Sequence, residues 1–356
     1  MTISIDQPKA IRKGEELDTN ALEQYLLAEL PDASGGLTVE QFPSGYSNLT
    51  YLIRLGDQEL VLRRPPFGNQ VKSAHDMRRE YRVLSRLCEV YPPAPKPLLF
   101  CQDHDIIGDD FYVMERRKGV ILRQSNAPDE LTDDPMLARN LCESFIDNLA
   151  DLHLLDYESA GLADIGKPQG YVERQVTGWA RRYEKAKTDE YADVEQLSAW
   201  LIEHMPGDGG AVLVHNDYKY DNLVLDPNDL THIEAVLDWE MATIGDPLSD
   251  LGTSLAYWTE AGDPPLSEMI NFGPTTIPGS LTRSELADRY ADRTGFDVSR
   301  IQYFYSFGLF KLAVILQQIY ARYHRGHTQD KRFAHLNDTV AALGTRGIDA
   351  INSGEF

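Results

Sequence analysis

The segment LVHNDYKYDNLVLDP, residues 213–227, sets an acid, a lysine and an amide close together between two short apolar runs. Asp217 is of a type that accepts a proton from an attacking hydroxyl group, and Lys219 carries a charge that would neutralise a phosphoryl group in transit. The amide oxygen of Asn222, with a second carboxylate such as Asp238, suits a hard cation such as magnesium. Phosphoryl transfer depends mainly on positioning and charge neutralisation, so these residue types predict that chemistry.

A hairpin is the element that would bring these groups together. The runs NLVLD and HIEAVLDWE are typical of strands, and PNDLT between them is typical of a turn. Folding the chain about a turn at residues 227–231 places Asn222 and Asp238 at the same end of the hairpin, because both lie about equally far from the turn. Asp217 then lies in the loop just beyond that end.

The remaining elements divide the chain into two parts. Up to about residue 117, strands are expected in LTVEQFP, LTYLIRLG, QELVLRRPP and FYVMERR, and a helix in SAHDMRREYRVLSRLCEVY. From about residue 130 the pattern is mainly helical, as in LARNLCESFIDNLADLHLLD and DVEQLSAWLIEHM. The predicted fold is α+β and bilobal. A small β-rich N-terminal lobe with one main helix covers residues 1–117, and a larger, mostly helical C-terminal lobe with the hairpin covers residues 118–356.

The composition argues against several classes of protein. Hydrophobic residues make up 42% of the 356-residue chain and charged residues 25%, as in ordinary soluble globular proteins. A formal net charge of -22 argues against a nucleic-acid partner, which would require a basic surface. The acidic surface serves either solubility or the steering of cationic ligands. Cys88, Cys101 and Cys142 are too few and too scattered for a disulfide framework or a zinc site.

Neither a leader nor a membrane span is expected. The N-terminus MTISIDQPKAIRKGEELD lacks the apolar core of a signal peptide, and its acidic residues are unusual for a transit peptide, so we expect a cytoplasmic protein. The most apolar stretch, IQYFYSFGLFKLAVILQQIYARYH, is interrupted by Lys311, Gln317 and Gln318 and is predicted to be a buried core helix. Nothing in the sequence indicates the oligomeric state.

The motifs resemble those of a known family. HNDYKYDN resembles the catalytic loop His-x-Asp-x-Lys-x-x-Asn of the eukaryotic-like kinase superfamily, and LDWE stands where that superfamily carries its metal-binding Asp-Phe-Gly. With VLDWEMATIGDPLSDLG and LADLH, these motifs look more closely like the aminoglycoside phosphotransferase family. Within it they are similar to the branch that includes kinase domains fused to acyl-CoA dehydrogenases. The resemblance covers about residues 38–325 and implies a protein-kinase-like fold with ATP and Mg2+ as cofactors.

The resemblance implies a role for each residue around the loop. Asp217 corresponds to the catalytic base, and Asn222 and Asp238 correspond to the magnesium ligands. His215 would order the loop. Asp250 in GDPLSDLG would brace the loop's backbone from the start of the next helix, and a plain helix cap is the alternative for this residue.

The N-terminal lobe carries the residues expected to bind the nucleotide. FPSGYSNLTY resembles the loop that covers the phosphates, where Ser47 and Asn48 would contact them, although it has a single glycine. Arg63 in LVLRR stands where kinases carry a lysine, and Glu80 is placed to pair with it; a solvated helix face is the alternative for Glu80. FYVMERRKG looks like the hinge, which would line the adenine site through backbone groups of Met114, Glu115 and Arg116.

These features predict an ATP- and Mg2+-dependent phosphotransferase that moves the γ-phosphoryl group to a hydroxyl of a small molecule. The alternative is a catalytically silent nucleotide-binding or scaffold protein of the same fold, suggested by Arg63 at the lysine position and by the single-glycine loop. The complete catalytic loop favours the enzyme. Its Lys219 matches the lysine of protein kinases rather than a residue shared by all the phosphotransferases.

Two classes of acceptor remain open. Aminoglycosides are polycations and suit an acidic cleft. The acyl-CoA-associated branch implies instead a hydroxyacyl thioester or a similar metabolite, which is anionic and needs a local basic pocket. VERQVTGWARRYEKAK offers Arg174, Arg181 and Arg182 on one expected helix, but a solvated face explains these cations equally well.

Overall fold

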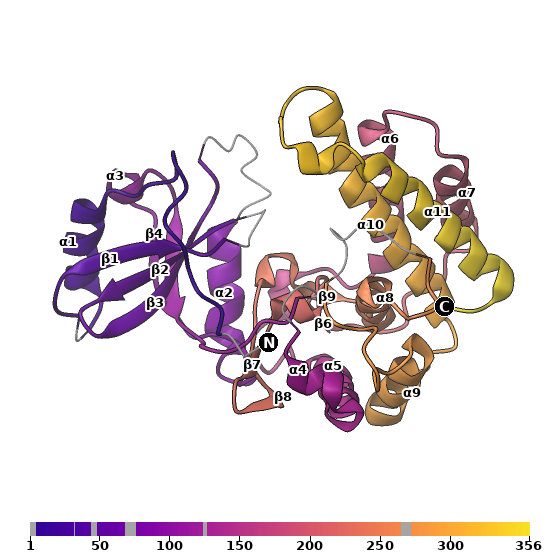
Figure 1. Cartoon of the computed structure of the whole chain (residues 1–356), viewed down its shortest axis with the longest axis horizontal. Coiled ribbons are helices and arrows are strands. Elements are labelled where there is room, and N and C mark those ends of the chain that lie inside the picture. Colours follow the sequence, from indigo (N-terminus) through magenta and orange to yellow (C-terminus); the bar gives the residue numbers. More distant parts are fainter. Residues whose placement is uncertain (1–4, 32, 44–47, 68–75, 124–126, 265–271) are drawn as a thin grey trace.

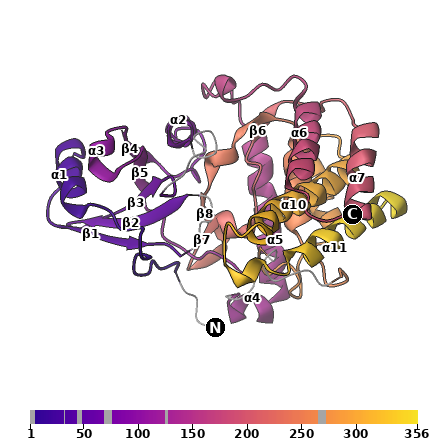
Figure 2. The same cartoon turned by 90° about the horizontal axis from the view of Figure 1, so that it is seen from above.

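The chain folds into two lobes (Figure 1). The computed structural model describes residues 5–31, 33–43, 48–67, 76–123, 127–264 and 272–356. A β-sheet with its helices forms the N-terminal lobe, and helices around two small strand pairs form the C-terminal lobe. The view from above shows the same separation, with the hairpin of β7 (Leu223–Asp226) and β8 (Asp229–Val236) at the junction of the lobes (Figure 2).

A five-stranded antiparallel sheet with the strand order β1-β2-β3-β5-β4 is the frame of the N-terminal lobe. Its strands are β1 (Leu37–Gln41), β2 (Leu49–Leu55), β3 (Gln58–Arg64), β4 (Pro97–Cys101) and β5 (Phe111–Glu115). Its helices are α1 (Thr19–Glu29), α2 (Met77–Leu87) and α3 (His104–Ile107). The chain leaves this sheet after β5, which lies between β3 and the edge strand β4, and enters the C-terminal lobe.

Alternating residues of the sheet belong to two different cores. Ile53 and Leu62 belong to a small core that also contains Leu22 of α1. Val61 and Tyr112 belong to the large core, which includes α2 and extends through the C-terminal lobe. The two-residue period of the strands thus directs one face toward α1 and the other toward α2 and the junction.

α10 is the central helix of the C-terminal lobe and packs against α6, α7, α8 and α11. The helices of this lobe are α4 (Asp129–Asp133), α5 (Pro135–His153), α6 (Tyr171–Ala186), α7 (Ala192–Glu203), α8 (Pro247–Tyr257), α9 (Arg283–Thr294), α10 (Ile301–His324) and α11 (Leu336–Ser353). By length and composition α10 could cross a membrane, but 78% of its apolar window is buried inside the protein. The prediction of a buried core helix is therefore confirmed.

Two strand pairs interrupt the helices, and one of them, the hairpin of β7 and β8, was predicted. β6 (Val212–Val214) pairs with β9 (Thr243–Gly245), and β7 pairs with β8. Three elements of the N-terminal lobe were not predicted, namely α1, α3 and β4. β4 begins at a proline at the edge of the sheet, where proline costs no ladder hydrogen bond. α1 has a weak apolar pattern, and its position is set by packing of Leu22 and Leu26 in the small core.

Candidate active site

The hairpin brings Asn222 and Asp238 to the same end, as predicted. The backbone N–H of Leu237 donates to the carbonyl of Asn222 at 2.8 Å, so Asp238 follows directly after the residue that pairs with Asn222. The turn occupies residues 227–228, between the paired ends of the strands, rather than residues 227–231. The predicted convergence is confirmed although the turn is shorter than predicted and lies nearer to β7, because irregularities in the pairing of the two strands still leave Leu223 opposite Val236.

Four hydrogen bonds hold the carboxylate of Asp217, which lies in the loop before the hairpin. Lys219 Nζ donates to both carboxylate oxygens, at 2.9 and 2.8 Å. The amide of Asn222 donates to Oδ2 at 2.9 Å, and the hydroxyl of Tyr257 in α8 donates to Oδ1 at 2.8 Å. Burial and the negative charge of Asp217 raise the pKa of Tyr257 well above its usual range, so this hydroxyl stays protonated and remains a donor.

Asp250 holds the backbone of the same loop from the first turn of α8. Its buried carboxylate accepts the backbone N–H groups of His215 and Asn216 at 2.6 and 2.7 Å. Burial alone would raise the pKa of Asp250, but the hydrogen bond and the charge of His153, at the end of α5, lower it. The side-chain cap of α8 is Asp246. The predicted brace is therefore confirmed, and the capping alternative for Asp250 is wrong.

His215 connects the loop to the hairpin. Its Nε2 donates to the carbonyl of Leu237 at 2.9 Å, and its Nδ1 accepts the backbone N–H of Asp217 at 3.2 Å. The ring is fully buried and packs edge-on against Trp239, with the ring centroids 4.7 Å apart. His215 was predicted to order the loop, and these two hydrogen bonds join the loop to the end of the hairpin.

A cavity of about 230 Å³ opens between the lobes beside these residues. Residues of β2, β3, β5 and the segment after β5 line one side of it, and the loop that carries Asp217 and the end of the hairpin line the other. The predicted site residues that line it are Arg63, Met114, Glu115, Arg116, Asp217, Lys219, Asn222 and Asp238. The fold thus gathers residues that are far apart in the sequence around one space.

Arg63 joins the two lobes at the back of this cavity. Its guanidinium forms ion pairs with Glu80 of α2 at 2.8 Å and with Asp238 at 3.0 Å. Glu80 is 1% exposed, so the predicted pairing is present and the solvated-face alternative is wrong. Burial alone would lower the pKa of Arg63, but the charges of Glu80 and Asp238 raise it well above its usual range. Burial likewise opposes ionisation of Asp238, yet the charge of Arg63 keeps its pKa lowered.

Of the other residues that were predicted to bind the nucleotide, the structure describes Asn48 and Arg116 but not Ser47. Ser47 lies outside the described residues. Asn48 is 1% exposed, and its amide donates to Glu240 at 2.7 Å, which ties the start of β2 to the turn after Asp238. The guanidinium of Arg116 is held by Glu59 at 2.6 Å.

Sequence reasoning missed several residues of this site. Tyr257 contacts Asp217 from 40 positions away, and no motif or spacing marks it. His153 lies in the quoted run LADLH, but its contact with Asp250 had no local signal. Arg79 of α2 donates to the carbonyl of Ala242 at 2.6 Å and links the helix to the segment before β9.

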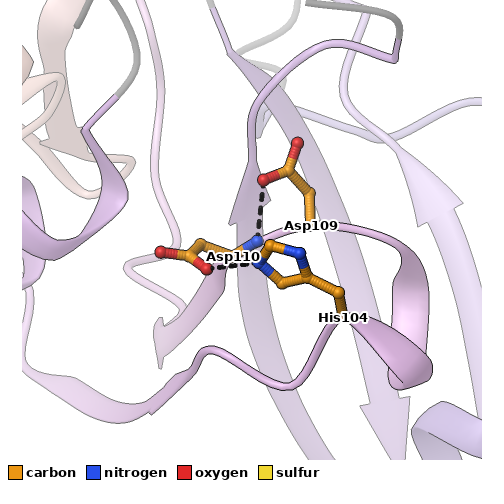
Figure 3. A group of neighbouring side chains, drawn as sticks. All are labelled: His104, Asp109 and Asp110. Carbon is orange, nitrogen blue, oxygen red and sulfur yellow. Dashed lines mark hydrogen bonds and ion pairs between the residues drawn. The ribbon is translucent and has the colours of Figure 1, made fainter. Parts of the chain in front are cut away.

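One further group of acidic and imidazole side chains lies in the N-terminal lobe (Figure 3). His104 Nε2 and Asp110 Oδ1 are 2.8 Å apart, and Asp109 accepts the backbone N–H of Asp110 at 2.9 Å. Within the described ranges these three residues are the set whose potential ligand atoms lie within 4.8 Å of one another. None of them lines the cavity, and the hydrogen bond between His104 and Asp110 connects α3 to the residue before β5.

Comparison with known proteins identifies related sequences along most of the chain. The phosphotransferase enzyme family (APH) matches residues 38–285. The chain is 38% identical over 346 residues to acyl-CoA dehydrogenase family member 11 of Rattus norvegicus, covering 94% of this chain and 43% of that protein. It is 33% identical over 347 residues to acyl-CoA dehydrogenase family member 10 of Mus musculus, covering 96% of this chain and 32% of that protein. The chain thus spans less than half the length of these relatives.

Solved structures show the same fold. A candidate aminoglycoside phosphotransferase from Ralstonia eutropha has a TM-score of 0.79 at 28% identity, covering 95% of this chain and 99% of that one. An aminoglycoside phosphotransferase in a ternary complex with AMP-PNP and hygromycin B has a TM-score of 0.58 at 16% identity, covering 94% and 99%. The predicted bilobal, protein-kinase-like architecture is therefore confirmed.

Proposed function

The chain belongs to the phosphotransferase enzyme family, and on that premise we propose that it transfers the γ-phosphoryl group of ATP to a hydroxyl of a small molecule. The observation that carries the proposal is the cavity between the lobes, which collects Asp217, Lys219, Asn222, Asp238 and Arg63 around one space. Acid, cations and oxygen ligands in one cleft are the groups that phosphoryl transfer requires.

Asp217 is the residue that accepts the proton of the attacking hydroxyl. Its carboxylate is fixed by Lys219, Asn222 and Tyr257, so it does not need to be ordered when the acceptor arrives. The Nζ of Lys219 also lies 4.7 Å from the centroid of the Phe272 ring, which positions the ammonium on the side of the base. From this position Lys219 offsets the charge that develops on the phosphoryl group.

The residues at the end of the hairpin fit a magnesium ion. The amide nitrogen of Asn222 is used twice, on the carbonyl and the carboxylate of Asp217, and its oxygen has no donor within the described part of the chain. Asp238 accepts from Arg63 with Oδ1, and its Oδ2 is likewise without a donor among the described residues. Two oxygen ligands of this type suit magnesium, which when bound would neutralise charge on the phosphates of the nucleotide.

The nucleotide would occupy the cavity with its base against the segment Met114–Arg116. Solved relatives of this fold carry AMP-PNP, ADP or GDP. Arg63 in place of the kinase lysine keeps the positive charge, and its pairing with Glu80 holds α2 against the site as the lysine would.

The acceptor that we propose is a hydroxyacyl thioester or a related hydroxylated metabolite. The support is the identity to the acyl-CoA dehydrogenase family members, which exceeds the identity to the solved aminoglycoside phosphotransferases. Incubating the chain with ATP, magnesium and a panel of hydroxy acids, their CoA thioesters, hygromycin B and kanamycin would identify the class, and GTP in place of ATP would test the nucleotide.

The matched test of the site uses three substitutions in one region. Asp217→Asn should abolish phosphoryl transfer while ATP binding persists, and Asp238→Asn should abolish transfer and weaken magnesium-dependent ATP binding. Asp229→Asn, an exposed carboxylate at the opposite end of the same hairpin, should behave as wild type. Full transfer activity in either of the first two variants would reject the assignment. Stabilisation by ATP and magnesium without transfer to any acceptor would favour a silent nucleotide-binding protein.

A further inference from the structure

The N-terminal segment before α1, described from residue 5, lies along one side of the cavity between the lobes. The backbone N–H of Asp6 donates to the carbonyl of Gly119 at 3.0 Å, beyond the end of β5. Three residues later, Lys9 exchanges two backbone hydrogen bonds with Gln41 of β1, at 2.8 and 2.9 Å. The segment therefore joins the N-terminal sheet to the chain that enters the C-terminal lobe, and Asp6 is one of the residues that line the cavity.

Asp6 belongs to a group of three charged side chains. The guanidinium of Arg123 donates to Oδ1 of Asp6 at 3.3 Å, and its Nε lies 3.4 Å from Oδ1 of Asp221. All three residues line the cavity, and 19% of the Asp6 side chain and 31% of the Asp221 side chain are exposed. Two carboxylates therefore share one arginine, and the group presents one net negative charge at the wall of the cavity.

The charge of this group decides which part of a nucleotide can lie against it. An ionised carboxylate accepts hydrogen bonds but cannot donate them, and it repels phosphates. The cations after β5 that line the cavity are each held by an acid: Arg116 and Lys118 by Glu59, Arg117 by Glu115, and Arg123 by the two aspartates. This wall therefore disfavours the triphosphate and suits uncharged groups that donate hydrogen bonds.

The group adjoins both ends of the proposed nucleotide site. Asp221 directly precedes Asn222, the proposed magnesium ligand, so it lies next to the phosphate end of the cavity. Arg123 lies on the segment that continues from Met114–Arg116, where the base would be bound. The part of a nucleotide that connects the base to the phosphates is the ribose, and its two hydroxyl groups are uncharged hydrogen-bond donors.

From this arrangement we infer that Asp6 and Asp221 bind the ribose hydroxyls of the nucleotide, and that Arg123 positions both carboxylates. The inference rests on the proposed phosphotransferase function and deepens it, because it selects ribonucleotides over deoxyribonucleotides and makes the N-terminal segment part of the nucleotide site. Asp6 lies outside residues 38–285, which match the family, so the family match does not supply this contact. Each contact is a hydrogen bond from a neutral hydroxyl to a charged acceptor, which is stronger than one between neutral groups.

The test compares three nucleotides in matched variants of the whole chain. Binding of ATP, 2′-deoxy-ATP and 3′-deoxy-ATP is measured by calorimetry with magnesium and without an acceptor. Wild type should bind ATP about tenfold more tightly than either deoxy form, as expected for the loss of a hydrogen bond to a charged group. Asp6→Ala and Asp221→Ala should each weaken ATP binding by a similar factor and reduce the preference for ATP over one deoxy form. Asp229→Ala, which removes an exposed carboxylate at the far end of the hairpin, should keep the wild-type preference.

The outcomes separate this inference from the proposed function. Equal affinity of wild type for ATP and both deoxy forms would overturn the inference and leave the phosphotransferase function standing. A variant that loses affinity for all three nucleotides by the same factor would show that its carboxylate only supports the fold, and would remove that residue from the ribose site. A changed preference in Asp221→Ala alone would exclude Asp6 and the N-terminal segment. If wild type binds none of the nucleotides, the proposed function and this inference both fail.

Discussion

Replacing Lys311 by methionine is expected to stabilise the protein at neutral pH. Burial lowers the pKa of Lys311 from 10.5 to about 8. Each pKa unit corresponds to about 1.4 kcal/mol. Burial of the charged lysine therefore lowers the free energy of unfolding by roughly 3 kcal/mol at pH values where Lys311 is charged in both the folded and the unfolded chain. Methionine is similar in length to lysine but cannot form the hydrogen bond to Thr253, and the loss of that bond costs about 1 kcal/mol. The net gain at pH 7 is therefore about 2 kcal/mol.

The sign of the pH dependence follows from the lowered pKa. Below about pH 8 the folded and unfolded chains both hold the proton on Lys311, so the full cost of burying the charge is present. Between about pH 8 and the ordinary lysine pKa of 10.5 the folded chain loses this proton while the unfolded chain keeps it, so the stability of the wild type rises with pH. The advantage of Lys311→Met should shrink across this range.

Urea unfolding followed by tryptophan fluorescence, repeated at intervals from neutral to alkaline pH, measures this difference directly. Arg182→Met serves as the control, because it also removes a cation from the Trp179 ring but from an exposed position. Its effect should be small and independent of pH. A Lys311→Met variant that is less stable than wild type at pH 7, or whose difference from wild type does not change with pH, would refute the reasoning. Lys311 would then be a structural residue with a favourable ionic environment.

Three further substitutions test the frame of the site. Asp250→Asn should lower the free energy of unfolding by about 1–3 kcal/mol and reduce kcat, because a buried anion that holds two backbone N–H groups is lost; an unchanged urea midpoint would contradict this. Tyr257→Phe should lower kcat and leave the KM for ATP unchanged, since it removes one hydrogen bond to Asp217, and the opposite pattern would place Tyr257 with the nucleotide. Arg63→Met should cost about 3–5 kcal/mol, because Glu80 keeps a buried charge without its partner. Adding Glu80→Gln should recover part of that loss in a double-mutant cycle, and strict additivity would show that the two residues are not coupled.

Much of the candidate active site could be predicted from the sequence because its geometry is local. Asp217, Lys219 and Asn222 lie in one short loop, and chain connectivity alone keeps them close. Asn222 and Asp238 come to the same end because the hairpin pairs Leu223 with Val236, although irregularities in the pairing place Asp238 farther along the chain from the observed turn than Asn222. Four of the five strands of the N-terminal lobe were also predicted, because runs of this composition between turn signals are typical of strands, whereas the edge strand β4 was missed.

The tertiary structure decided how this loop is held and what surrounds it. Tyr257 reaches Asp217 and His153 reaches Asp250 from other helices, at separations of 40 and 97 positions. Contacts of this length depend on how helices pack, which the volumes and shapes of many side chains determine together. The same holds for Lys311. In the sequence it interrupts an apolar run, and only the packing of α10 against α8 and α6 reveals a buried cation without a carboxylate partner in the described part of the chain. Functional groups that lie close together in the sequence can therefore be recognised from residue spacing. Groups that come from different helices can be recognised only in the packed structure.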